Sequence, residues 1–377
     1  MNNEIYFDNA ATTAVSEKAA KKIMELLTVK YGNPSSLHTK GIEAEAEVDY
    51  ARKITAHTLS ASHNEIYFTS GGTEANNLAV IGAAMARKKI GKKIVSTSIE
   101  HSSVMKSLKY LEDEGFEVTY LKPDANGIIT PKEFADAVDD QTVLVTAMLV
   151  NNEIGSVLDI ENIRNAVFRK NPKTVFHTDA VAAFGKIPIN VKTLGVDLLT
   201  ISAHKIHGPK GVGALFVKNG VRLIPRSFGG SQEKGLRIGT EATPLIAGFG
   251  AAVSELEIKD NLNKISELQS YLRKELLKLD DVDINSPPDA MPYILNFSAN
   301  GIKSETLLHY LASENIFVSS GSACAKGKQS HVLVSLGLNK RRADSALRIS
   351  FSHNNTKEEI DVFLSKLQNG LNSLVRK

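Results

Sequence analysis

Hydrophobic and polar positions form two alternating patterns along the first two thirds of the chain. Short, nearly continuous apolar runs predict seven strands, at residues 66–69, 93–97, 117–121, 143–148, 174–178, 198–202 and 213–217. Apolar positions at helical spacing predict helices between several of them, at residues 74–89, 103–114, 131–138 and 160–170. Strands this apolar are typical of a parallel sheet buried on both faces. The pattern therefore predicts an α/β fold with a mostly parallel, doubly wound, seven-stranded sheet.

The pattern changes after about residue 255. Helices are predicted at residues 258–279, 304–314 and 357–374, and short strands near residue 284 and at residues 293–297, 316–319 and 347–351. Thr356 and Glu359 form the capping-box pattern at the start of the last helix. We therefore predict that a smaller α+β domain follows the large sheet.

Composition limits the class of protein. The 377 residues predict two domains, or one large α/β domain with an appendage. The net charge is +3 and no basic block exceeds three residues, which argues against nucleic-acid binding. No apolar stretch approaches the roughly 20 residues of a membrane span. The first residues lack a basic region followed by an apolar one, and this together with a single cysteine predicts a cytoplasmic protein.

The one cysteine, Cys324, is the first candidate for chemistry. A lone thiol forms no internal disulfide and cannot by itself hold a structural zinc ion, so we predict no metal site. Small residues at 321–323 precede it, and Lys326 and Lys328 follow it. An exposed, electropositive loop favours a nucleophilic thiolate. The alternative is a structural cysteine, which more often lies among large aliphatic residues.

A second candidate, Lys205, comes directly after the predicted strand 198–202, in the run Ser202-Ala-His-Lys205 before a Gly/Pro-rich turn. A lysine at a buried strand end is costly unless it is functional or paired. An amine with a lowered pKa there is suited to form a Schiff base with a cofactor aldehyde. Lys210 is the competing lysine, and its Gly/Pro surroundings suggest that it points outward.

Other strand ends carry the groups that pyridoxal phosphate chemistry needs. Backbone N–H groups near Gly72 and Thr73, where a helix begins, can hold a phosphate. Asp179 can pair with a pyridinium nitrogen, His101 can stack on the ring or shuttle protons as a catalytic residue, and residues 151–155 offer amides. Each of these also has a purely structural explanation. The glycines can form a turn, Asp179 can cap a helix, His101 can be a hydrogen-bonded histidine, and residues 151–155 can be a polar loop. Because ligands collect at the carboxyl ends of parallel strands, their coincidence indicates one site.

With these motifs, the chain resembles the cysteine desulfurases (NifS/IscS-like), in the class V aminotransferase branch of the fold type I pyridoxal phosphate enzymes. The form Ser319-Ser-Gly-Ser-Ala-Cys324 resembles the group I desulfurases that serve iron–sulfur assembly. The resemblance spans nearly the whole chain and includes Tyr6-Phe-Asp-Asn-Ala-Ala-Thr-Thr13, Gly32-Asn-Pro-Ser-Ser-Leu-His38, Phe68-Thr-Ser-Gly-Gly-Thr-Glu-Ala-Asn-Asn77, Glu100-His-Ser-Ser-Val104, Asn151-Asn-Glu-Ile-Gly155, His177-Thr-Asp-Ala180, Ser202-Ala-His-Lys205, Gly239-Thr240 and Leu347-Arg-Ile-Ser350.

This resemblance implies roles for particular residues. Lys205 would hold pyridoxal 5′-phosphate and abstract the α-proton of the substrate, L-cysteine. Cys324 would attack the substrate sulfur, leaving alanine and a persulfide that a sulfur-acceptor or scaffold protein collects. Residues implied to bind cofactor or substrate are Gly72, Thr73, Ser202 and His204 at the phosphate, Thr240 from the partner subunit of a homodimer, Asp179 at the ring nitrogen, His101 on the ring, and Asn152, Asn33 and Arg348 at the substrate.

The resemblance also implies domain bounds, with residues 15–255 in the large domain and residues 1–14 joining 256–377 in the small one. Two departures stand out: Ala182 replaces the usual glutamine near the cofactor, and the segment between Cys324 and Ser330 is short. A selenocysteine lyase or another pyridoxal phosphate C–S lyase is the main alternative. A Ser-x-x-Lys hydrolase is disfavoured, because that motif needs a helix, and a non-catalytic relative is a further alternative.

Overall fold

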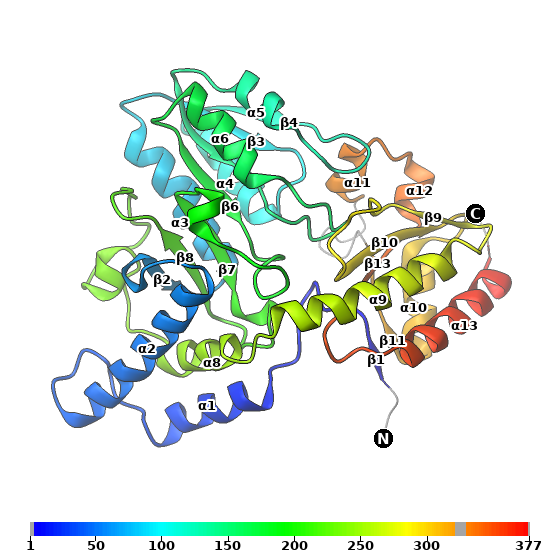
Figure 1. Cartoon of the computed structure of the whole chain (residues 1–377), viewed down its shortest axis with the longest axis horizontal. Helices are drawn as coiled ribbons and strands as arrows, with labels where there is room; N and C mark the ends of the chain where they lie inside the picture. Colours follow the sequence, from blue (N-terminus) through cyan, green and yellow to red (C-terminus); the bar gives the residue numbers. More distant parts are fainter. Residues whose placement is uncertain (1–3, 321–328, 376–377) are drawn as a thin grey trace.

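The computed structural model describes residues 4–320 and 329–375. It is organised by a seven-stranded and a four-stranded sheet. Figure 1 shows them on opposite sides of the molecule, with helix α9 (Ile258–Leu276) running from one part towards the other. We call the two halves the large-sheet part and the small-sheet part. Among the described residues, no helix combines the length and apolar character needed to cross a bilayer.

The seven-stranded sheet confirms the predicted α/β fold. Its strands are β2 (Ile66–Thr69), β3 (Lys93–Thr97), β4 (Glu117–Leu121), β5 (Thr142–Thr146), β6 (Val175–Asp179), β7 (Leu198–Ser202) and β8 (Gly213–Val217), in the order β2-β8-β7-β6-β5-β3-β4. All neighbours are parallel except β8, which runs antiparallel to β2 and β7. The predicted strand 143–148 ends earlier than expected, because residues 147–150 leave the sheet and lead towards the cavity described below.

The predicted helices of this part all form within two residues of their expected bounds. They are α3 (Gly72–Arg87), α4 (Ser102–Asp113), α5 (Pro131–Ala137) and α6 (Ile160–Lys170). The sequence pattern did not predict α1 (Glu17–Thr28), α2 (Thr39–Thr58), α7 (Val191–Leu194) or α8 (Thr243–Val253). Helix α8 packs against α1 and α2 and is buried along nearly its whole length. Because α8 is apolar on every face, its sequence has no amphipathic period.

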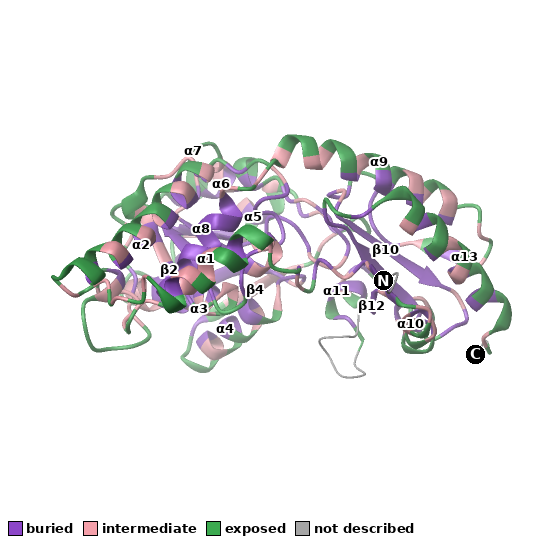
Figure 2. Cartoon of the chain, turned by 90° about the horizontal axis from the view of Figure 1, so that it is seen from below, coloured by how far each residue is buried: buried purple, intermediate pink, exposed green. Residues whose placement is uncertain are grey.

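The small-sheet part has the strand order β12-β13-β10-β9. Its strands are β9 (Val282–Ile284), β10 (Ile294–Ala299), β12 (Ser319–Ser320) and β13 (Ala346–Ser350). Its helices are α9, α10 (Ser304–Ser313), α11 (His331–Ser335), α12 (Lys340–Asp344) and α13 (Lys357–Ser373). Figure 2 shows α9 and α13 with their exposed faces outward over the buried strands. The predicted capping box forms at Thr356, whose side chain accepts a hydrogen bond from the backbone N–H of Glu359.

The beginning of the chain joins the small-sheet part. Strand β1 (Ile5–Tyr6) pairs in parallel with β11 (Ile316–Phe317). The ring of Phe7 packs edge-on against Phe351, with centroids 5.6 Å apart. Short 3₁₀ turns complete the chain at η1 (His63–Glu65), η2 (Ala203–Lys205) and η3 (Gln232–Gly235).

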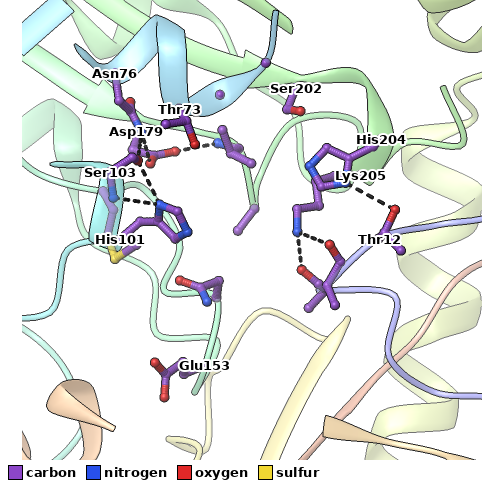
Figure 3. A pocket seen from close by; sticks show the side chains of 18 of the residues that line it. Thr12, Thr73, Asn76, His101, Ser103, Glu153, Asp179, Ser202, His204 and Lys205 are labelled. Atoms are coloured by element: carbon purple, nitrogen blue, oxygen red, sulfur yellow. Dashed lines mark hydrogen bonds between the residues drawn. The ribbon is translucent and has the colours of Figure 1, made fainter. Parts of the chain in front are cut away.

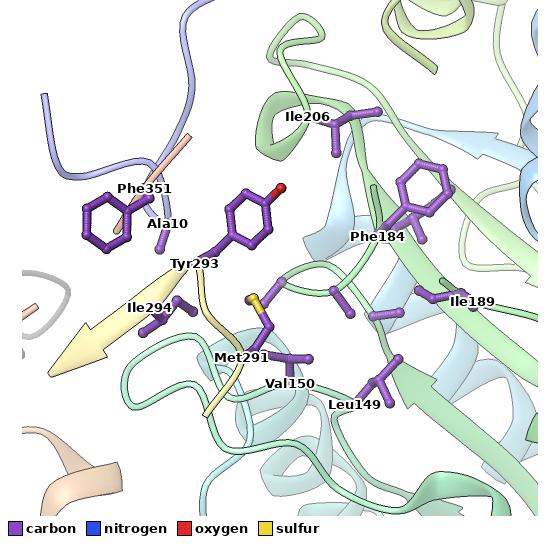
Figure 4. Packing of buried hydrophobic residues seen from close by; sticks show 14 of the residues in the cluster. Ala10, Leu149, Val150, Phe184, Ile189, Ile206, Met291, Tyr293, Ile294 and Phe351 are labelled. Carbon is purple, nitrogen blue, oxygen red and sulfur yellow. The ribbon is translucent and has the colours of Figure 1, made fainter. Parts of the chain in front are cut away.

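One buried apolar cluster extends through both parts. Figure 4 shows Phe184 and Ile206 of the large-sheet part near Met291, Tyr293 and Phe351 of the small-sheet part. Burial of apolar surface contributes roughly 25 cal/mol for each Å² removed from water, so a shared cluster stabilises the two parts against separation. The relative position of the two sheets is therefore set by packing as well as by the chain connections.

The first prediction concerns the contact between α2 and α8. A Cβ atom added at Gly250 would lie 2.7 Å from the Cβ and 2.8 Å from the Cα of Ala51. Alanine normally favours a helix interior over glycine, but this methyl group would push two helices apart. We expect Gly250→Ala to lower the free energy of unfolding by about 1–3 kcal/mol, measured by urea denaturation.

The matched control is Ser270→Ala on the exposed face of α9, expected to change stability by less than about 0.5 kcal/mol. Stability of Gly250→Ala equal to or above that of the unsubstituted protein would contradict this packing.

Candidate active site

A cavity of about 580 Å³ lies between the two parts, at the carboxyl ends of the central strands (Figure 3). Most of the residues that the sequence singled out line it together: Gly72, Thr73, His101, Asn152, Asp179, Ser202, His204, Lys205 and Arg348. The structure does not bring Asn33 or Thr240 to this cavity within the single chain; both are exposed. Cys324 lies outside the described residues.

The turn from β2 into α3 forms one end of the cavity. Gly71 has a backbone φ of 150°, a region that favours glycine. A Cβ atom at Gly72 would lie 2.8 Å from Cγ2 of Val181, so only glycine fits against that wall. The buried hydroxyl of Ser202 has no hydrogen-bond partner among the described residues. Free backbone N–H groups at a helix N-terminus beside an unsatisfied hydroxyl suit a phosphate group.

The carboxylate of Asp179 is buried at the end of β6 and held in place from two sides. One oxygen accepts from the side-chain nitrogen of Asn76 at 2.7 Å, and the other accepts from the backbone N–H of Val181 at 2.9 Å. Asn76 donates its second hydrogen to the hydroxyl of Ser103 at 2.9 Å. A buried carboxylate with these bonds is fixed in position and can face a protonated ring nitrogen.

His101 belongs to the same network. Its Nδ1 accepts from the backbone N–H of Ser103 at 3.2 Å and lies 2.8 Å from the Ser103 hydroxyl. These donors place the proton of the neutral ring on Nε2. Burial, together with the nearby Lys205 and His331, lowers the pKa of His101 below its ordinary value, and Asp179 opposes this shift. His101 therefore favours the neutral imidazole, which can stack on a ring or accept a proton.

Lys205 lies in η2, directly after β7. Its amine donates hydrogen bonds to the backbone carbonyl oxygens of Ala10 and, at 2.7 Å, Ala11 (Figure 3). Lys210, the competing lysine, is exposed and lies at the edge of the same cavity. Burial, reinforced by nearby lysines, lowers the pKa of the neighbouring His204 to about 4, which keeps its ring neutral.

Arg348 lies on β13, faces the cavity from the small-sheet part, and is 8% exposed. Its Nη2 donates to the carboxylate of Asp8 at 2.7 Å, and its Nη1 donates to the backbone carbonyl oxygen of Asn152 at 2.9 Å. The Nε group has no hydrogen-bond partner among the described residues. The guanidinium is therefore oriented and keeps a donor for an incoming carboxylate.

Glu153 lines the cavity, and Glu100 is hydrogen-bonded to Met148, which also lines it. Glu153 accepts from the hydroxyl of Ser330 at 2.5 Å, and burial raises the pKa of Glu153. Glu100 is fully buried; one of its oxygens accepts from Thr97 at 2.7 Å and from the N–H of Met148 at 2.9 Å. Burial raises the pKa of Glu100 to about 8, so it is protonated near neutral pH.

We did not predict Asn76, Ser103, Asp8 or Glu153 as site residues from the sequence. Each stands inside or beside a quoted motif, but its role depends on a tertiary partner that spacing does not reveal. Asn76 could have been found from the sequence, because an amide among the apolar residues of a buried helix must have hydrogen-bond partners. Ala182 lines the cavity with a methyl group, so it offers no side-chain hydrogen bond in place of the glutamine that the resemblance leads one to expect.

Comparisons with known proteins identify the family of this chain. The family model described as aminotransferase class-V matches residues 5–363, and the chain belongs to this family. The chain is 42% identical over 377 residues to cysteine desulfurase IscS of Clostridium botulinum, covering 97% of this chain and 94% of that protein. It is 40% identical over 365 residues to cysteine desulfurase IscS of Methanosarcina thermophila, covering 96% and 90%.

Solved structures give the same result. A NifS-like protein superposes with a TM-score of 0.94 at 38% identity, covering 98% of this chain and all of that chain. SspA in complex with cysteine superposes with a TM-score of 0.83 at 35% identity, covering 93% of this chain and all of that chain. The expected fold type is confirmed.

The second prediction tests the buried carboxyl of Glu100. Because its pKa in the folded protein is raised to about 8, folding retains a proton that the unfolded chain loses at lower pH. The stabilisation is present below the unfolded pKa and is lost as pH rises through the folded pKa. Between pH 6 and pH 9, the unsubstituted protein should lose about 2–3 kcal/mol of unfolding free energy relative to Glu100→Gln.

Urea denaturation of both proteins across this pH range measures the difference. Glu114→Gln, at an exposed position, should follow the unsubstituted protein at every pH. Parallel stability curves for Glu100→Gln and the unsubstituted protein would show that Glu100 is already ionised.

Proposed function

We propose that this cavity converts L-cysteine to L-alanine and places the released sulfur on Cys324. The chain is a cysteine desulfurase that depends on pyridoxal 5′-phosphate. One observation carries the assignment of the site: Lys205, Asp179 and the phosphate-type cradle at Gly72 lie around one cavity, opposite the guanidinium of Arg348.

The residues present fit the cofactor. The N–H groups at the start of α3, with Thr73, Ser202 and His204, would hold its phosphate. Asp179 would face its ring nitrogen, His101 would stack on the ring, and Lys205 would hold the aldehyde carbon. When bound, pyridoxal phosphate supplies an electron sink that eases bond breaking at the substrate's α- and β-carbons.

The chain's own residues would act on the substrate. Arg348 would bind the carboxylate of L-cysteine, with Asn152 beside it, and the amine of Lys205 would take the α-proton. The thiolate of Cys324 would then attack the substrate sulfur: an S–S bond forms as the C–S bond breaks. The substrate carbon keeps the electron pair of the broken bond and takes a proton, which yields alanine and a persulfide on Cys324.

The third prediction tests the transfer of sulfur from L-cysteine to Cys324. Incubation with L-cysteine should yield alanine and a mass gain of one sulfur on Cys324, detected by amino-acid analysis and peptide mass spectrometry. Cys324→Ala should lose the persulfide and most alanine formation. Lys205→Ala should lose both together with the visible absorbance of bound cofactor, whereas Lys106→Ala, an exposed lysine on α4, should change neither.

Continued release of sulfide by Cys324→Ala would identify a plain C–S lyase. Turnover of L-selenocysteine but not L-cysteine would identify a selenocysteine lyase.

We also infer that the protein is a homodimer. Large apolar side chains gather in the α1–α2 region and face solvent in the single chain: Met24, Leu27, Val29, Tyr31, Leu37 and Ile42. Leu37 is 97% exposed and Tyr31 is 68% exposed. A cluster of this kind is typical of a protein interface. Exposed Thr240 would then reach the partner's phosphate site.

The fourth prediction tests this surface. Tyr31→Glu with Leu37→Glu should convert a dimer into a monomer, measured by light scattering coupled to size-exclusion chromatography, because two charges would be buried without partners. Val362→Glu, at an exposed apolar position on α13, is the control and should remain dimeric. A dimer that survives both interface charges would place the contact elsewhere.

We also propose bounds for the two domains. The pairing of β1 with β11 supports a small domain of residues 1–14 with 256–377 and a large domain of residues 15–255.

The destination of the sulfur is a further part of the proposal. The Ser-Ser-Gly-Ser-Ala-Cys motif supports transfer from Cys324 to an acceptor or scaffold protein, for iron–sulfur clusters, thio-cofactors or tRNA. The single cysteine supports a cytoplasmic location.

A further inference from the structure

A second cavity, of about 330 Å³, adjoins the active site, and we call it the rear cavity. Lys205 lines both cavities. The large-sheet part contributes Lys186 and His207 to the rear cavity, and the small-sheet part contributes Tyr293 and His353. The proposed desulfurase reaction uses none of these four side chains.

Lys186 is unusual because its side chain is almost completely buried. It is 5% exposed and lies 5.6 Å from the centre of the Tyr293 ring. Within residues 4–320 and 329–375, no carboxylate lies at ion-pair distance from its amine. Burying a charge without a partner costs several kcal/mol. Burial, with Lys205 and Arg348 nearby, lowers the pKa of Lys186 to about 7. The fold thus holds an amine that an anion would stabilise.

Two exposed residues of the same cavity are negatively charged. Glu255 and Glu257 are exposed and line it just before α9. One oxygen of Glu255 accepts from the hydroxyl of Ser16 at 2.5 Å, which orients this carboxylate. Burial lowers the pKa values of His353 and His207. Both glutamates oppose this shift at His353, and Glu255 also opposes it at His207. The rear cavity therefore has a buried amine at Lys186 and exposed carboxylates at Glu255 and Glu257.

Apolar groups form much of the remaining wall. Ile206, Leu256 and Phe351 line the rear cavity, with the ring of Tyr293. The volume is at the lower end of the range for small-molecule sites, which are mostly apolar with a few placed polar groups. A phosphate would gain from Lys186 but would meet two carboxylates at the exposed side. A molecule with a carboxylate and an ammonium group carries the charge that complements each of these residues.

We propose that the rear cavity binds a small free amino acid, its carboxylate on Lys186 and its ammonium group beside Glu255 and Glu257. L-alanine and L-cysteine both have this chemistry. A bound amino acid places a carboxylate in the cavity that Lys205 also lines. The site does not depend on the desulfurase reaction, since none of its binding groups takes part in the proposed chemistry.

Chemical labelling of Lys186 in the cofactor-loaded protein tests this site directly. Cyanate carbamylates unprotonated amines and is small enough to enter the cavity, and peptide mass spectrometry reports each lysine separately. We expect saturating L-alanine to slow carbamylation of Lys186 at least tenfold, while exposed Lys259 reacts at an unchanged rate. Acetate, which lacks the ammonium group, should protect Lys186 less well.

Two variants distinguish this site from the active site. Arg348→Gln removes the proposed substrate clamp and should leave the protection by L-alanine intact. Glu255→Gln with Glu257→Gln should reduce that protection to the level given by acetate. Protection that disappears in Arg348→Gln, protection unaffected by the double substitution, or no labelling of Lys186 in the folded protein would each overturn the proposal.

Discussion

The assembly of the site depends on hydrogen bonds made by residues 8–13, which cross from the small-sheet part to the large-sheet part. The N–H of Ala10 donates to the hydroxyl of Ser350 at 2.8 Å on one side. The N–H of Thr13 donates to the carbonyl oxygen of His204 at 2.9 Å on the other. Ser350 ends β13, which carries Arg348, and His204 lies in η2, which carries Lys205. This short segment therefore fixes the position of Arg348 relative to Lys205.

The same segment supplies groups that oppose the positive charge of the site. The carboxylate of Asp8 binds Arg348, and the carbonyl oxygens of Ala10 and Ala11 accept from Lys205. Three cationic side chains, including Lys186, would otherwise repel one another in a partly buried volume. The crossing segment therefore makes it possible to concentrate amines and a guanidinium where an anionic substrate and cofactor are to be bound.

The large sheet and the strand-end residues could be predicted because both follow local rules. Buried parallel strands are nearly all apolar, and residues such as Asp179 and Lys205 come directly after them. Helix α8 escaped prediction because burial on every face removes its period. Asp8 and Asn76 act only through partners brought by tertiary folding. In the proposed dimer, Thr240 would act through a second subunit, which the sequence of one chain does not represent. Resemblance, rather than pattern, supplied the role of Arg348.

The central claim is that Lys205 carries the cofactor, and one measurement addresses it most directly. The protein is loaded with pyridoxal phosphate, reduced with borohydride and digested, and the modified peptide is sequenced by mass spectrometry. We expect a stable phosphopyridoxyl group on Lys205 alone. Its appearance on Lys210 or Lys186, or on no lysine of a folded protein, would contradict the assignment.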